Sequence, residues 1–162
     1  MPKPDTFQTP DDDTRALVRS LIESASEVVL ATLRPDTATP YLSRVAMAVD
    51  PDGVPMTMVS NLAHHTAALE ANSACSLMVE APASKGDAMN HPRLTLHCHA
   101  RIIDNDDPQR ETLRDLFLAQ RPKSKLYIDF PDFRFVRFEI ENGLLNGGFG
   151  KAYLLAPSDI RH

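Results

Sequence analysis

Residues 93–103 read RLTLHCHARII, and this stretch decides the fold class of the chain. Apolar or small side chains alternate with polar ones along its whole length. One set is Leu94, Leu96, Cys98, Ala100 and Ile102, and the other is Arg93, Thr95, His97, His99 and Arg101. Strict alternation is typical of an antiparallel strand with one buried and one solvated face. The pattern therefore predicts a long, half-buried strand at 93–103.

Shorter strands are expected on both sides of this one. Apolar segments rich in β-branched residues predict strands at 28–33, 41–49, 54–60, 74–80 and 134–141. The segment Asp50-Pro51-Asp52-Gly53 predicts a turn, because proline fixes φ and glycine accepts a positive φ. We therefore expect 41–60 to form one β-hairpin. Asn142-Gly143 predicts another turn, ahead of a Gly-rich segment within 144–155.

Helical periodicity and composition predict three helices, at 12–25, 64–72 and 107–120. Aspartates that can cap a helix precede the two longer ones, Asp12 or Asp13 in the first and Asp106 or Asp107 in the second. Strands outnumber helices, and the two do not alternate regularly. The fold class is therefore predicted to be mainly β (α+β), an antiparallel barrel with accessory helices rather than a doubly wound parallel sheet.

Length and charge limit the domain count and the classes of partner. A chain of 162 residues is about one domain, so we expect a flexible N-terminal arm at 1–13 and a single domain at 14–162. The net charge of −5 disfavours nucleic acid or an anionic membrane as a partner. No secretory signal and no membrane-length apolar run is visible, so a cytoplasmic location is expected. Cys75 and Cys98 form no CxxC pair, and two reduced, buried thiols are favoured over a single disulfide.

The junction between 54–60 and 64–72 is the first candidate site. Free N–H groups at a helix start attract anions, and Ser60, Asn61 and Thr66 add hydroxyl and amide groups. His64 or His65 can add a positive charge. These residues predict a phosphate site, and the alternative is a plain helix cap with two exposed histidines.

Two further segments carry candidate ligand groups. His97 and His99 share the polar face of 93–103 with two arginines, which suit an anion better than a metal, so no metal site is predicted. The segment 146–153, NGGFGKAY, allows close backbone approach to a ligand, and Lys151 offers a mobile positive charge. The alternative for this segment is a β-bulge or a hairpin turn.

Three stretches together resemble a known family. They are VVLATLRPDTATPYLSRVAMAVDPDGVPMTMVSNLAHHTAALEAN (28–72), GDAMNHPRLTLHCHARI (86–102) and FPDFRFVRFEIENGLLNGGFGKAY (130–153). They look like the pyridoxamine-phosphate-oxidase-like FMN-binding split barrels, most closely the haem-utilisation (HugZ-type) branch, over roughly residues 12–155. The resemblance implies a six-stranded split barrel that forms a homodimer, with one FMN at each end of the interface.

The resemblance also implies which residues hold the cofactor. The FMN phosphate would be held by Ser43, Arg44 and Val45 together with Ser60, His65 and Thr66. Arg93 and Thr95 match positions that approach the flavin across the dimer interface. Phe149 and Lys151 look like the part that lines the reactive face of the flavin.

The expected function is that of an FMN-binding oxidoreductase acting on a small molecule. The flavin carries the redox chemistry, so no catalytic residue is assigned. The chain has no Trp and shows no counterpart of the C-terminal signature of true pyridoxamine phosphate oxidases, so that reaction is not expected. Two alternatives stay open: a haem-binding or haem-degrading protein of the HugZ type, and a flavin-binding module without turnover.

Overall fold

The sheet is antiparallel, and eight strands belong to it in the computed structural model, which describes residues 6–82 and 84–161. The strands are β1 (Glu27–Leu33), β2 (Pro40–Ala46), β3 (Ala48–Val49), β4 (Pro55–Ser60), β5 (Ala74–Glu80), β6 (Arg93–Ile103), β7 (Phe133–Asn146) and β8 (Ala152–Leu155). Their order is β2-β1-β5-β6-β7-β4-β3, with β8 paired to β7. The predicted class, an antiparallel split barrel with accessory helices, is confirmed, although the described residues form eight strands rather than six.

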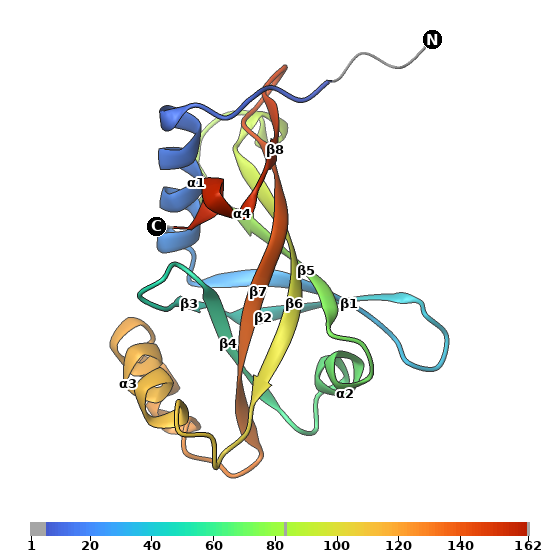
Figure 1. Cartoon of the computed structure of the whole chain (residues 1–162), viewed down its shortest axis with the longest axis vertical. Helices are drawn as coiled ribbons and strands as arrows, with labels where there is room; N and C mark the ends of the chain where they lie inside the picture. The colour runs from blue at the N-terminus through green and yellow to red at the C-terminus, as the bar shows by residue number, and fades with distance from the viewer. Residues whose placement is uncertain (1–5, 83, 162) are drawn as a thin grey trace.

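Two long strands form the middle of the sheet. β6 and β7 pair from Arg93↔Asn146 to Ile103↔Phe135, with one irregularity between His97 and Cys98. Figure 1 shows them along the long axis of the molecule, with β1 and β2 crossing behind them. The sheet curls until β2 and β4 touch, where the Thr57 hydroxyl donates to the Ala46 carbonyl. β2 and β4 are thus in contact but are not paired by backbone hydrogen bonds, so the barrel is split between these two strands.

The helices cover the ends of this barrel. They are α1 (Asp12–Ser24), α2 (His64–Ala71), α3 (Arg110–Gln120) and α4 (Pro157–Ile160), with short 3-10 turns η1 (Ala88–Asn90) and η2 (Pro122–Leu126). The cap of α1 is Asp11, whose carboxylate accepts from the Thr14 N–H at 2.8 Å, and not Asp12 or Asp13. α3 begins later than predicted, because Asp107 accepts from the Gln109 N–H in the turn that precedes the helix.

The predicted hairpin at 41–60 is wrong in its main pairing. The turn at 50–53 exists, with Gly53 at a φ of 78° and the Asp50 carboxylate accepting from the Val54 N–H. However, only β3 pairs with β4 there, over two residues on each side. β2 pairs with β1 along its whole length, and β4 pairs with β7.

The second predicted turn, at Asn142-Gly143, is also wrong. β7 runs through both residues and ends at Asn146. Gly143 is buried, and a Cβ built on it would lie 3.1 Å from Cδ1 of Ile160 in α4. The glycine therefore allows α4 to lie close against the strand. The true turn is the Gly-rich segment, which joins β7 to β8, so the hairpin alternative for that segment is confirmed.

The buried side chains form two groups on either side of β7. The larger lies under α1 and includes Val18, Leu30, Leu77, Leu96 and Phe138. The smaller lies under α3 and includes Met56, Phe117, Ile128 and Phe135. Cys75 and Cys98 are facing partners on β5 and β6, both buried and unbridged. Burial raises the pKa of the Cys75 thiol to about 12, so this thiol is not a ready nucleophile.

The predicted N-terminal arm lies partly outside the described residues, which begin at Thr6. Gln8 is docked on the sheet: its N–H donates to the Ala152 carbonyl at 2.8 Å, and its side chain donates to the Gly150 carbonyl at 2.9 Å. The division at residue 13 stays a prediction. In the part of the chain that the structure describes, no helix has the length and apolarity that a membrane crossing requires.

Candidate functional site

The start of α2 lies against β2, and this contact organises the candidate site. β4 ends at Ser60, the chain turns, and α2 begins at His64. Nδ1 of His65 lies 3.2 Å from Oγ of Ser43 on β2. The contact therefore joins 43–45 to 60–66, the two segments that the resemblance assigns to one phosphate site.

A cleft of about 250 Å³ opens beside this contact. It is lined by Arg44, Val45, Ala46, Met58, Ser60, Ala63, His65, Tyr127 and Phe133. Four of the predicted residues, Arg44, Val45, Ser60 and His65, are in this set. The cleft has polar groups on the side of α2 and β2 and an aromatic wall on the other side.

The aromatic wall was not predicted from the sequence. Tyr127 follows η2 and Phe133 begins β7, and their ring centroids are 5.2 Å apart. The signal available was the run YIDFPDF at 127–133, in which three of the seven residues are Phe or Tyr. Aromatic side chains at the edge of a polar cleft give a flat apolar surface for a ligand ring.

The electrostatics of the cleft favour an anion. No side chain caps the N-terminus of α2, so the positive end of this helix is left for solvent or a ligand. The Arg44 side chain is 77% exposed, and its ion pair with Glu27, at 3.8 Å, is loose. Burial, together with the neighbouring His64, lowers the pKa of His65, so His65 is neutral at pH 7 in the absence of an anion.

Thr66 and Asn61 have internal partners. Thr66 is 1% exposed, and its hydroxyl donates to the Ser60 carbonyl at 2.6 Å. Asn61 accepts from Nε of Arg134 at 2.7 Å and is not among the residues that line the cleft. Ser60 donates to Asp132 at 2.8 Å. Thr66 thus positions the turn, whereas a direct role for Asn61 in binding a ligand stays a prediction.

The other predicted residues lie elsewhere in the chain. Arg93 pairs with Asn146 at one end of β7, whereas Ser60 pairs with Phe133 at the other end. Asn146 and Phe133, and with them Arg93 and Ser60, are therefore about 40 Å apart along β7. Phe149, 97% exposed, and Lys151 lie at the nearby tip of the β7–β8 hairpin. One copy of the chain does not bring this second group to the cleft.

Thr95 lies in a row of residues that runs across one face of the sheet, from the cleft toward the β7–β8 hairpin. Register places one residue from each of six strands in a row: Arg44, Val29, Met78, Thr95, Leu144 and Leu154. Each is half-buried or exposed, so the row faces away from the core. It begins at the arginine of the cleft and is mostly apolar beyond it.

The fold defines the class of protein: an antiparallel split barrel, here with a cleft at the start of its second helix. The sequence profile of the pyridoxamine 5'-phosphate oxidase family matches residues 14–146. The chain belongs to this family.

The chain is also similar to individual proteins. The chain is 36% identical over 115 residues to the non-canonical heme oxygenase HOZ, chloroplastic, of Arabidopsis thaliana. The aligned residues make up 71% of this chain and 34% of that protein. The crystal structure of Atu2129 from Agrobacterium tumefaciens is 30% identical, with a TM-score of 0.81 over 96% of this chain and 64% of that one. A heme binding protein from Mycobacterium smegmatis is 24% identical, with a TM-score of 0.81 over 95% of this chain and 61% of that one. The chain thus spans about a third of HOZ and less than two thirds of these two solved structures.

Proposed function

We propose that this chain is an FMN-binding protein whose site is shared by two copies, and that it acts as a flavin-dependent oxidoreductase on a small molecule. The observation that carries the proposal is the convergence of Arg44, the Ser43–His65 contact and the uncapped start of α2 on one cleft. Backbone N–H groups at a helix start and an arginine are the usual partners of a phosphate. Bound FMN supplies hydride or electron transfer, and the residues of the chain bind and orient it.

The size of the cleft supports a shared site. A cleft of about 250 Å³ is below the range of roughly 300–1,000 Å³ that is usual for cofactor pockets. It has room for the phosphate end, and Tyr127 and Phe133 offer an apolar edge to the part of the cofactor beyond the phosphate. The ring system then needs a second surface, which a second copy docked on the exposed row would provide.

The exposed row supports a homodimer. Val29, Met78 and Leu144 form a half-buried apolar strip on the sheet face that points away from the core. In a two-fold dimer the same patch serves both copies. Thr95 lies in this row, and Arg93 lies on the same face two residues before it. Both would thus approach the cleft of the other copy, which is the arrangement that the resemblance implies.

Titration with FMN and riboflavin tests the phosphate site, because riboflavin lacks only the phosphate. We expect FMN to bind at least ten-fold more tightly than riboflavin, and R44Q to remove most of that preference, since a charge-assisted hydrogen bond is worth roughly 1.5–3 kcal/mol. R101Q is the matched control: it makes the same charge change at an exposed residue of β6, outside the cleft. Equal binding of FMN and riboflavin to the wild-type protein would refute the phosphate assignment.

Haem is a second candidate ligand, supported by the names of two relatives. The chain offers a histidine in a suitable place: His97 lies half-buried on the exposed face, with Ser76 and Asn142 as its partners in the register. Imidazole is a common ligand of haem iron, and the anion cleft suits a carboxylate as well as a phosphate. An absorption spectrum of the protein as purified separates the candidates, since flavin gives two visible bands and haem a Soret band. If haem binds, H97A should shift the Soret band and H99A should leave it unchanged.

A further inference from the structure

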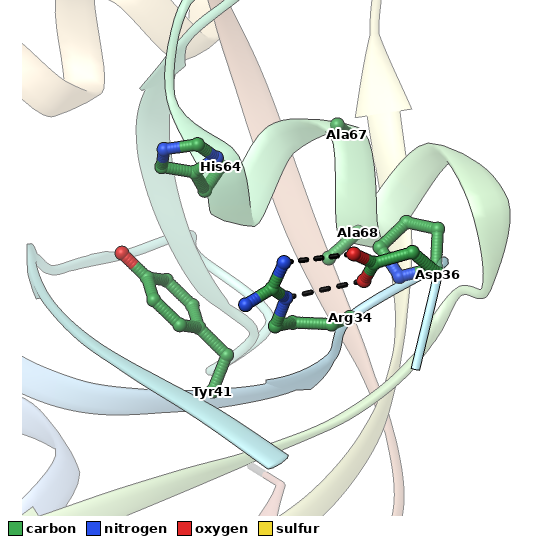
Figure 2. A pocket seen from close by; sticks show the side chains of 7 residues that line it. Arg34, Asp36, Tyr41, His64, Ala67 and Ala68 are labelled. Carbon is green, nitrogen blue, oxygen red and sulfur yellow. Dashed lines mark hydrogen bonds and ion pairs between the residues drawn. The ribbon is translucent and has the colours of Figure 1, made fainter. Parts of the chain in front are cut away.

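A second cavity, separate from the cofactor cleft, lies on the other side of the α2 start. Its volume is about 360 Å³, and it is lined by Arg34, Pro35, Asp36, Tyr41, His64, Ala67 and Ala68. Figure 2 shows Arg34 and Asp36 from the β1–β2 turn, Tyr41 from β2, and His64 and the two alanines from α2. The two cavities share no lining residue: His64 lines this one and His65 lines the other.

The polar groups of this cavity are arranged around one arginine. Nε of Arg34 donates to Asp36 at 3.1 Å and Nη2 donates to the other carboxylate oxygen at 2.8 Å. This two-point contact fixes the plane of the guanidinium. Figure 2 shows the third nitrogen, Nη1, on the side that faces Tyr41 and His64. The Arg34 guanidinium therefore offers the cavity hydrogen-bond donors of fixed orientation.

The rest of the wall is apolar and partly flat. The Tyr41 and His64 rings meet edge to face, with centroids 6.2 Å apart. Ala67 and Ala68 leave space along α2 because their side chains are short. A ring fits against such a wall, and a carboxylate on that ring reaches the free N–H groups of Arg34.

We propose that this cavity binds a small aromatic monocarboxylate. The ring lies between Tyr41 and the alanines of α2, and the carboxylate accepts from Nη1 of Arg34. The volume is within the usual range for small-molecule sites and suits a single substituted ring. One carboxylate matches the N–H groups of Nη1 and Nη2 that Asp36 leaves available. This site is independent of the proposed cofactor site.

Benzoate is the probe, and backbone amide NMR of the protein as purified is the readout. We expect saturable shifts centred on His64, Ala67 and Ala68, with little change at Ala46 and Met58 of the cofactor cleft. Benzamide, a neutral analogue, should bind about ten-fold more weakly, because it lacks the charge that Arg34 recognises. Shifts that do not saturate, or that centre on Ala46 and Met58, would overturn the proposal.

Two alanine positions in α2 provide a matched pair of variants. A67L fills the cavity with a good helix former, and A71L makes the same change at an exposed position of the same helix that does not line the cavity. We expect A67L to lose benzoate binding at least ten-fold, while FMN or haem binding is kept. A71L should bind benzoate as the wild type does. Equal benzoate affinity in both variants would place the probe elsewhere and refute this site.

Discussion

His65 and Ser43 join the first turn of α2 to the middle of β2, with 3.2 Å between Nδ1 and Oγ. Of the two adjacent histidines, His65 lines the cleft beside Arg44, whereas His64 lies against Tyr41 and lines the second cavity. Neighbours in the sequence therefore serve different cavities, because successive helix residues point about 100° apart.

The lowered pKa of His65 predicts a pH-dependent stability. Burial favours the neutral ring in the folded chain, so the unfolded chain takes up the proton first as the pH falls. The contribution of neutral His65 to the free energy of unfolding is complete above its ordinary pKa of 6.5. It is lost as the pH falls through the lower pKa that His65 has in the folded chain. Urea unfolding of the cofactor-free protein between pH 8 and pH 5 measures it. H65Q should show a flatter profile, and parallel profiles would contradict the assignment to His65.

The Thr66 hydroxyl predicts a stability effect at the α2 start. T66V keeps the side-chain shape but removes the hydroxyl donor of the Ser60 carbonyl, which still accepts from the Ala63 N–H. We expect a loss of about 0.5–1.5 kcal/mol in the free energy of unfolding, and weaker FMN binding because the turn loosens. T66S retains the hydroxyl and should recover most of both. If T66V and T66S unfold alike, the hydrogen bond is not the stabilising element.

The ion pair between Asp50 and Arg137 predicts the largest loss of stability. The Asp50 side chain is 4% exposed and accepts from Arg137 as well as from the Asp52 and Val54 N–H groups. D50A removes all three bonds and leaves a half-buried arginine unpaired, so we expect a loss of about 3–5 kcal/mol. D52A, at an exposed position of the same turn, should cost less than about 0.5 kcal/mol. Chemical denaturation of the three proteins gives the comparison.

The exposed row predicts how the proposed dimer responds to charge. M78E places a carboxylate in the middle of the apolar strip, next to Val29 and Thr95 in the register. We expect dimer association to weaken at least ten-fold and FMN affinity to fall with it, while the monomer stays folded. A16E adds the same charge on an exposed position of α1 and should leave both unchanged. Sedimentation velocity measures association, and a dimeric M78E would contradict this choice of face.

Local sequence patterns were sufficient where an element depends on its own side chains. The alternation in 93–103 predicted β6 with its observed bounds, and the helical spacing predicted α1 to within one residue. The strand at 74–80 and the helix at 64–72 were equally local. In 93–103 and in α1 one face is apolar at the period of the element, so the chain needs no distant information to adopt it.

Pairing partners were not predictable in the same way. The turn at 50–53 is real, yet β2 pairs with β1, and the two-residue strand β3 is all that remains of the hairpin on that side. Met47 separates β2 from β3: it is fully buried, and its N–H donates to the Ser26 carbonyl. The choice of partner depends on how the whole sheet closes, which a local pattern does not encode.

The segments that form the candidate site were predictable from the sequence, but the aromatic wall of the cleft was not. The junction at 60–66 predicted a phosphate site, the family resemblance added 43–45, and the structure brings Ser43 and His65 into contact. Tyr127 and Phe133 were missed because an aromatic in a core and an aromatic at a cleft edge look alike in a sequence. The roles predicted for Arg93, Thr95, Phe149 and Lys151 would need a second copy of the chain, and no periodicity within one chain reveals a partner.

β4 pairs from Met56 to Ser60 with the first residues of β7, although 72 residues separate Ser60 from Phe133. During synthesis the chain therefore completes β4 long before the strand that covers its edge leaves the ribosome. Five of its six residues are buried in the finished barrel. Until β7 is synthesised, β4 therefore exposes apolar side chains and an unpaired edge, both of which promote aggregation. Nascent chains should rely on chaperones until β7 emerges, and slowing translation between 61 and 132 should increase aggregation of the newborn protein.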